Sequence, residues 1–226
     1  GATGIAVFGD VSRHSQKLIH YFDISDTHES RYSRPVPIWD MKPEYEAEII
    51  ETLENNFGEV EDSSSLASTI KCVAQNATED NIPDYVGDLF YSTVNSFLED
   101  MDDDTIASMF KKTVANSVAY MIMKRLGIDA EKYFAYEDFA DILKFNTPET
   151  LNAIGFATSD IAEMGLTEIA RTVMSIEREN RIIAEQRQNE YNAETNNEAE
   201  RSFDNDRHNL HNAGRLQSPE FDTTGT

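Results

Sequence analysis

The sequence predicts a mainly α-helical protein that begins with part of a β-hairpin or sheet and ends in a disordered tail. Three observations support this fold class. Strand-type runs are confined to residues 4–39, apolar residues recur at helical spacing from Pro43 to about Glu185, and Asn, Glu, Gln and Arg dominate thereafter. We therefore divide the chain into residues 1–42, 43–185 and 186–226.

The first segment carries two short strand signals. Ile5 and Val7 form one, and the run from Leu18 to Phe22 forms the other, with a polar loop between them. Because two strands alone are marginally stable, we expect them to be the remnant of a sheet whose other strands lie upstream of Gly1. An extended linker from Arg34 to Trp39 follows, and we expect Trp39 to pack this linker onto the helices.

The middle segment has the apolar stripes of amphipathic helices. Pro43 suits the first turn of a helix that ends near Gly58, and a serine run precedes the helix that contains Leu66 and Ile70. The remaining helices are expected at 84–98, 104–126, 136–144 and 148–155, with a last helix from about Asp160 to Glu185. Gly127 is placed to end the 104–126 helix.

Two clusters of side chains invite a metal-site interpretation. The aspartates between Asp100 and Asp104 precede a helix, where negative charge is stabilising, and they lack the spacing and the glycine of a calcium loop. His208 and His211 form an H-x-x-H pair in the polar tail, which is a weak metal signal. We interpret the first cluster as a helix start, and the sequence predicts neither a metal nor another cofactor.

Charge is distributed unevenly along the chain. The net charge is −23, yet residues 1–42 are neutral, while residues 43–176 contain 26 acidic and 8 basic residues. Such a surface repels nucleic-acid phosphates, so it is expected to serve solubility or a basic partner. DNA contacts, if made, would come from the first segment, where the available donors include Arg13, Lys17, Arg31 and Arg34.

The sequence also bears on location. It contains no apolar stretch of about 20 residues, so it predicts no membrane span. The single cysteine, Cys72, excludes an internal disulfide framework and fits the reducing cytoplasm. We expect a cytoplasmic protein without a membrane partner. The chain starts without methionine at Gly1 and stops at Thr226, and both ends are expected to be cuts through a longer protein.

Two stretches resemble the ArdC-type antirestriction proteins of conjugative elements and phages. One comprises Gly1–Ile5 and the run Tyr21-Phe22-Asp23-Ile24-Ser25-Asp26-Thr27, which is similar to the end of the family's single-stranded-DNA-binding domain. The other is Thr113–Tyr120, followed by Arg125-Leu126-Gly127, which is similar to the third-ligand helix of its zincin-like metallopeptidase domain. The resemblance implies a helical zincin-like domain over residues 43–185, preceded by a remnant of the DNA-binding domain.

Every metal position of that family is altered in this chain. Tyr91 and Asn95 stand where the two histidine ligands would be, Ser92 replaces the glutamate base, and Asn116 replaces the third ligand. No histidine lies between residues 41 and 200, and a phenol with two amides makes a poor zinc site. If 84–98 is helical, Tyr91 and Asn95 share one face. Asn116 could meet them there in a polar cluster, or Tyr91 and Asn95 could simply face solvent.

The resulting functional expectation is a non-catalytic module of a mobile-element DNA-processing or antirestriction protein. By the resemblance, it would link a DNA-binding domain to helicase or adenine-specific DNA methylase domains, and only those domains would carry enzymatic activity. Two alternatives stay open. One is an acidic protein-interaction or DNA-mimic module, and the other is an active hydrolase or metallopeptidase whose metal site lies elsewhere.

Overall fold

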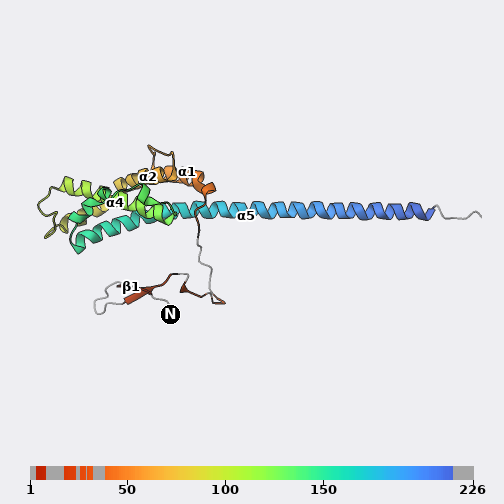
Figure 1. Cartoon of the computed structure of the whole chain (residues 1–226), viewed down its shortest axis with the longest axis horizontal. Helices are drawn as coiled ribbons and strands as arrows, with labels where there is room; N and C mark the ends of the chain where they lie inside the picture. Colours follow the sequence, from red (N-terminus) through yellow and green to blue (C-terminus); the bar gives the residue numbers. More distant parts are fainter. Residues whose placement is uncertain (1–3, 9–17, 24–25, 29, 33–38, 216–226) are drawn as a thin grey trace, which may run out of the picture. The chain divides into compact units, whose positions relative to one another are not determined.

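A computed structural model describes residues 4–8, 18–23, 26–28, 30–32 and 39–215, with the backbone alone for 7–8 and 196–215. The chain divides into two compact units, Gly1–Ile38 and Trp39–Thr226, a few residues before the predicted boundary at 42. The described chain is mainly helical, with one small antiparallel sheet near its start, which confirms the predicted fold class (Figure 1).

The first unit contains a two-stranded sheet. Strand β1 (Ile5–Phe8) pairs antiparallel with β2 (Leu18–Tyr21), so that Ile5 lies opposite Tyr21 and Phe8 opposite Leu18. Leu18, Ile19 and Tyr21 are all exposed, as is the following Phe22, so both faces of β2 lack cover among the described residues. The predicted pair of antiparallel strands is confirmed.

The second unit begins with a short 3₁₀ turn, η2 (Pro43–Tyr45), followed by α1 (Glu46–Phe57) and α2 (Leu66–Asn81). Ser65 caps α2 by accepting a 3.2 Å hydrogen bond from the Ser68 amide. Next come α3 (Pro83–Tyr91), α4 (Asp103–Arg125) and three 3₁₀ segments, η3 (Ala130–Lys132), η4 (Tyr136–Asp138) and η5 (Ala140–Lys144). The last element is α5 (Pro148–Arg215).

Helix α4 lies at the centre of the core. Its buried side chains occur on most of its circumference and pack against α2 on one side and α5 on another. The fully buried Phe110 contacts Phe145, with ring centroids 6.2 Å apart. Gly165 allows α5 to approach α4 closely, since an added Cβ would lie 3.0 Å from the Ile122 Cδ1. A helix buried on nearly all sides is typical of a core element.

Four predictions about the helices between residues 84 and 160 are wrong. The helix expected over 84–98 ends at Tyr91, and the one expected over 136–144 is two short 3₁₀ segments. Gly155 does not end a helix, and Asp160 does not begin one, because α5 is continuous from Pro148. Both residues lie inside α5, where Ile154, Ala157 and Ile161 are buried. Tertiary packing therefore overrides these local stop and start signals.

The tail also differs from expectation. Residues 178–195 have exposed side chains throughout, so they lie outside the packed core as predicted. They are nevertheless helical, since α5 continues to Arg215 rather than giving way to disorder at residue 186. Residues 216–226 lie outside the described part of the chain. None of the described helices combines the length and apolar content needed to cross a membrane.

Trp39 packs onto the helices, as the sequence predicts. Its ring is buried, and the guanidinium of Arg125 at the end of α4 stacks on it at 4.0 Å. The same guanidinium donates a 3.1 Å hydrogen bond to the Trp39 carbonyl. Trp39, the first residue of the helical unit, is thereby fixed to the C-terminal end of α4.

Two glycines should respond oppositely to substitution by alanine. Gly127 ends α4 with φ of 74°, and the Ile128 amide donates back to the Met123 carbonyl at 2.9 Å. Gly127→Ala should therefore cost about 1 kcal/mol. Gly155 lies inside α5 with open space at its Cβ position, so Gly155→Ala should stabilise by about 0.5–1 kcal/mol. Urea unfolding measures both, and equal effects of the same sign would contradict the assigned conformations.

Candidate interaction surface

The residues at the positions of the peptidase metal site do not face one another from two helices. These residues are Tyr91, Ser92, Asn95 and Asn116. Tyr91 is the last residue of α3 and is 88% exposed, and Ser92 caps that end by donating a 2.9 Å hydrogen bond to the Asp88 carbonyl. Asn95 has φ of 64°, and its backbone N–H donates a 2.8 Å hydrogen bond to Glu99 Oε2. The prediction that Tyr91 and Asn95 share one helix face is wrong, because the helix ends between them.

Asn116 has a different partner. It lies on α4, where its side-chain amide donates a 2.9 Å hydrogen bond to the Asp138 carbonyl and so ties η4 to α4. No hydrogen bond joins it to Tyr91, Ser92 or Asn95, all of which are described. The predicted polar cluster is thus not formed by direct hydrogen bonds. The stretch Thr113–Tyr120 is helical, and α4 ends just before Gly127, as the apolar spacing and the glycine predict.

Of the four residues predicted to contact DNA, the structure describes one. Arg31 is exposed, whereas Arg13, Lys17 and Arg34 lie outside the described residues. The acidic cluster before α4 is a helix cap, because Asp102 accepts hydrogen bonds from the Thr105 amide at 2.9 Å and its hydroxyl at 2.8 Å. These bonds lower the pKa of Asp102. Within the described residues, no group of three or more His, Cys, Asp or Glu side chains is arranged to bind a metal ion.

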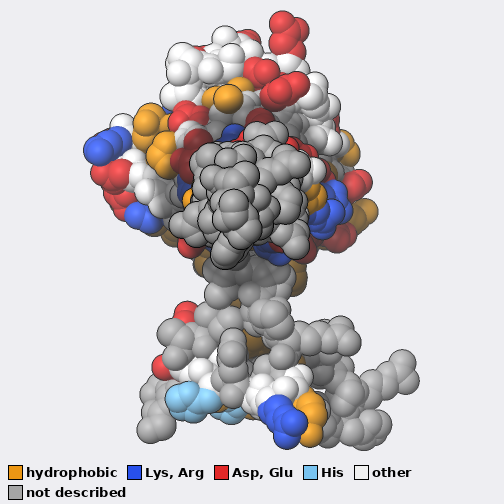
Figure 2. Space-filling model, turned by 90° about the vertical axis from the view of Figure 1, so that its right-hand side faces the viewer, with side chains coloured by type: hydrophobic (Ala, Val, Ile, Leu, Met, Phe, Trp, Pro, Cys, Tyr) orange, Lys and Arg blue, Asp and Glu red, His pale blue; other side chains and the backbone are white. Residues whose placement is uncertain are grey.

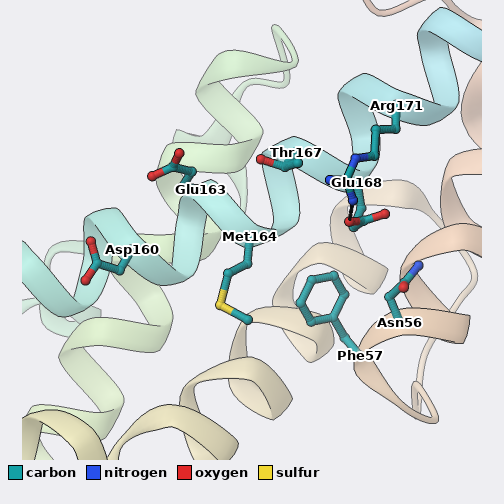
Figure 3. A pocket seen from close by; sticks show the side chains of 8 residues that line it. All are labelled: Asn56, Phe57, Asp160, Glu163, Met164, Thr167, Glu168 and Arg171. Atoms are coloured by element: carbon teal, nitrogen blue, oxygen red, sulfur yellow. Dashed lines mark hydrogen bonds and ion pairs between the residues drawn. The ribbon is translucent and has the colours of Figure 1, made fainter.

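A surface pocket of about 460 Å³ lies between the end of α1 and the part of α5 from Asp160 to Arg171 (Figure 3). Asn56 and Phe57 contribute from α1. From α5 come Asp160, Glu163, Met164, Thr167, Glu168 and Arg171. Figure 3 shows Arg171 paired with Glu168, and Met164 beside Phe57. The pocket has an apolar part, formed by Phe57 and Met164, and three carboxylates. Of these, only Glu168 is neutralised, by Arg171.

A second pocket, of about 390 Å³, lies between α3 and the start of α5. It is lined by Asp84, Tyr85, Asp88, Ser92, Glu149, Asn152, Ala153, Phe156 and Asp160. Asp160 lines both pockets, so they adjoin along one face of α5. We call the two pockets together the α5 groove. Of the predicted site residues, only Ser92 belongs to it.

The α5 groove is acidic and partly apolar. Six carboxylates line it, against the single cation of Arg171. Phe156 is 66% exposed and Met164 is 43% exposed, although both are large apolar side chains. The hydroxyl of Tyr85 donates a 3.1 Å hydrogen bond to Asp160 Oδ2 and links α3 to α5. Burial, and then this contact with Asp160, raises the pKa of Tyr85, so its hydroxyl remains a donor at neutral pH.

Acidic residues are also present elsewhere on the helical unit. Figure 2 shows Asp and Glu side chains over much of its visible described surface, with Lys and Arg between them. Many of the bases in this unit are paired, as in the contacts of Lys111 with Glu79 and of Lys112 with Asp141. The α5 groove places carboxylates and exposed apolar groups together along one helix. Sequence reasoning missed it because it ended one helix at Gly155 and began the next at Asp160, which left Phe156 between two elements.

Another carboxyl group with a strongly lowered pKa among the described residues is that of Glu131 on η3. Glu131 accepts hydrogen bonds from Lys124 Nζ at 2.9 Å and from the Tyr120 hydroxyl at 3.0 Å. The hydrogen bond from Lys124 contributes most to lowering the pKa of Glu131 to about 2. Contact with Glu131 in turn raises the pKa values of Lys124 and Tyr120. The cluster connects η3 to α4, and we interpret it as structural.

Comparison of the chain with protein-family models, curated proteins and solved structures finds no match. The resemblance to ArdC-type proteins therefore stays a prediction from the quoted residues.

Glu131 should make stability depend on pH in the acid range. Because folding lowers its pKa from 4.5 to about 2, its contribution is present above pH 4.5 and is lost as the pH falls towards 2. Glu131→Gln should therefore lower the urea midpoint at pH 7, and the difference from the unmodified chain should shrink between pH 4.5 and 2. Glu137→Gln, at an exposed position nearby, is the control. A difference that stays constant with pH would contradict this role.

Proposed function

We propose that the helical unit is a non-catalytic interaction module that presents an acidic face to a basic protein partner. The observation that carries the proposal is the α5 groove, where carboxylates surround exposed apolar side chains. A surface that served solubility alone would need the charges but not the apolar groups. Carboxylates together with exposed aromatic and thioether side chains favour recognition of a surface that is both basic and apolar.

The arrangement of the peptidase-like positions supports a non-catalytic function. Their side chains are a phenol, a hydroxyl and two amides, which are poor zinc ligands and include no general base of the kind that activates a metal-bound water. In addition, Asn116 is occupied with the backbone of η4, and Asn95 lies outside any helix. Ser92, Asn95 and Asn116 therefore contribute hydrogen bonds to local structure.

The module should bind a basic peptide at a single site. A 20-residue peptide rich in lysine and leucine should saturate at one peptide per chain in isothermal titration calorimetry. Its affinity should fall as NaCl rises from 50 to 300 mM, because exposed charge pairs are screened. A peptide of the same length with Glu in place of Lys is the control. Many weak, non-saturating sites would show that the acidic surface serves solubility.

A second candidate function follows from the resemblance. The chain would then connect a DNA-binding domain with helicase or methylase domains of a mobile-element protein. The specific observation in its favour is α4, which carries the Thr113–Tyr120 stretch and ends just before Gly127. In that setting an acidic module could act as a DNA mimic, and inhibition of a restriction endonuclease by the chain would favour mimicry over binding of a basic peptide.

Single-stranded DNA should bind this chain only weakly. The first segment has few basic residues, with acidic ones that offset them, and the helical unit repels phosphates. A labelled 30-nucleotide strand titrated at 150 mM NaCl should show a Kd on the order of 10⁻⁴ M, the weak end of non-specific binding. Fluorescence anisotropy measures this affinity. Submicromolar binding would contradict the charge argument and strengthen the DNA-binding candidate.

A further inference from the structure

We propose that the α5 groove binds a basic amphipathic helix whose two apolar anchors are seven or eight residues apart. This inference rests on the proposed function and adds the binding site and the class of ligand. Three properties of the groove support it: its length, the spacing of its apolar groups and its charge.

The groove follows one face of a single helix. Its α5 residues run from Glu149 to Arg171 and recur every three or four positions, which corresponds to a length of about 33 Å at 1.5 Å per residue. The opposite face of the same stretch is buried, with Ile154, Ile161 and Ile169 in the core. Helix α3 and the end of α1 border the exposed face at different points along it. A partner helix of about 20 residues has a matching length.

The apolar groups occur at two points. Phe156 lies in the pocket beside α3, and Met164 lies with Phe57 in the pocket beside α1. The eight residues from Phe156 to Met164 correspond to about 12 Å along α5. A helix that lies along the groove would place two apolar side chains at this distance if they are seven or eight residues apart. Helix-in-groove recognition uses anchors of this kind.

Charge identifies the ligand as basic. Asp160 lies between the two apolar points, and Glu149 and Asp84 lie beside Phe156. The only cation in the groove, Arg171, is paired with Glu168. No salt bridge with another described residue is formed by Asp84, Glu149 or Asp160, although Asp160 accepts the Tyr85 hydroxyl. Lys or Arg between and beside the anchors of a partner helix would supply the missing positive charge. A second copy of this chain is a poor occupant, because two chains of net charge −23 repel each other.

The test uses the full chain and three fluorescent peptides of 20 residues. The first is an amphipathic helix with six Lys and two Leu anchors seven residues apart. The second keeps the six Lys but has Ser at both anchors, and the third keeps the anchors but has Glu for Lys. Anisotropy titrations at 150 mM NaCl should show the first peptide binding at least tenfold more tightly than the second, with no binding of the third.

Two variants locate the site. Phe156→Ser should weaken the first peptide at least tenfold and leave the second unchanged, because it removes an anchor contact and no charge. The double variant Asp160→Asn and Glu163→Gln should weaken both peptides. Its control, Glu51→Gln and Glu61→Gln, removes the same charge at exposed positions outside the groove and should change binding less than threefold. Circular dichroism melting verifies that each variant folds.

The outcomes separate this inference from the function on which it rests. Equal binding of the first two peptides, unaffected by Phe156→Ser, would overturn the groove but leave a general acidic interaction surface. Failure of both basic peptides to bind would overturn both proposals. A chain that sediments as a dimer and becomes monomeric with Phe156→Ser would assign the groove to a second copy and would also overturn the inference.

Discussion

The burial of α4 is the constraint on which the rest of the helical unit depends. Because apolar side chains occur on most of its circumference, α4 must be covered by other helices. Helices α2 and α5 supply that cover, and Gly165 permits the close approach of α5. The rotation of α5 about its own axis is then determined, since Ile154, Ile161 and Ile169 must face inward.

That rotation explains how acidic and apolar groups come to share one exposed face. Once the isoleucines face α4, the positions of Glu149, Phe156, Asp160 and Met164 must face outward, whatever their polarity. Their carboxylates remain at the surface, where charge is tolerated, and Asp160 gains the Tyr85 hydroxyl as a partner. The groove is therefore a consequence of core packing combined with the borders formed by α3 and the end of α1.

Several elements could be predicted from local sequence because their determinants are local. The serine before α2 and the aspartate before α4 both cap their helices, and Pro148 begins α5 where expected. Prediction failed where competing signals were resolved by packing. The chain after Tyr91 turns, with Asn95 at positive φ, although Val94 and Phe97 continue a helical apolar spacing. Both of these side chains are exposed, so no burial stabilises a longer helix there.

The sequence alone determined that this protein is mainly helical, that its helical part is strongly acidic and that a short strand pair precedes it. These properties follow from periodicity, capping residues and charge, which act over one or two turns of chain. Only the tertiary structure decided that Asn116 bonds to Asp138 rather than joining Tyr91 and Asn95, and that Phe156, Asp160 and Met164 form one groove. Those juxtapositions depend on which face of α5 packs against α4 and on where α3 ends, and contacts between distant residues control both.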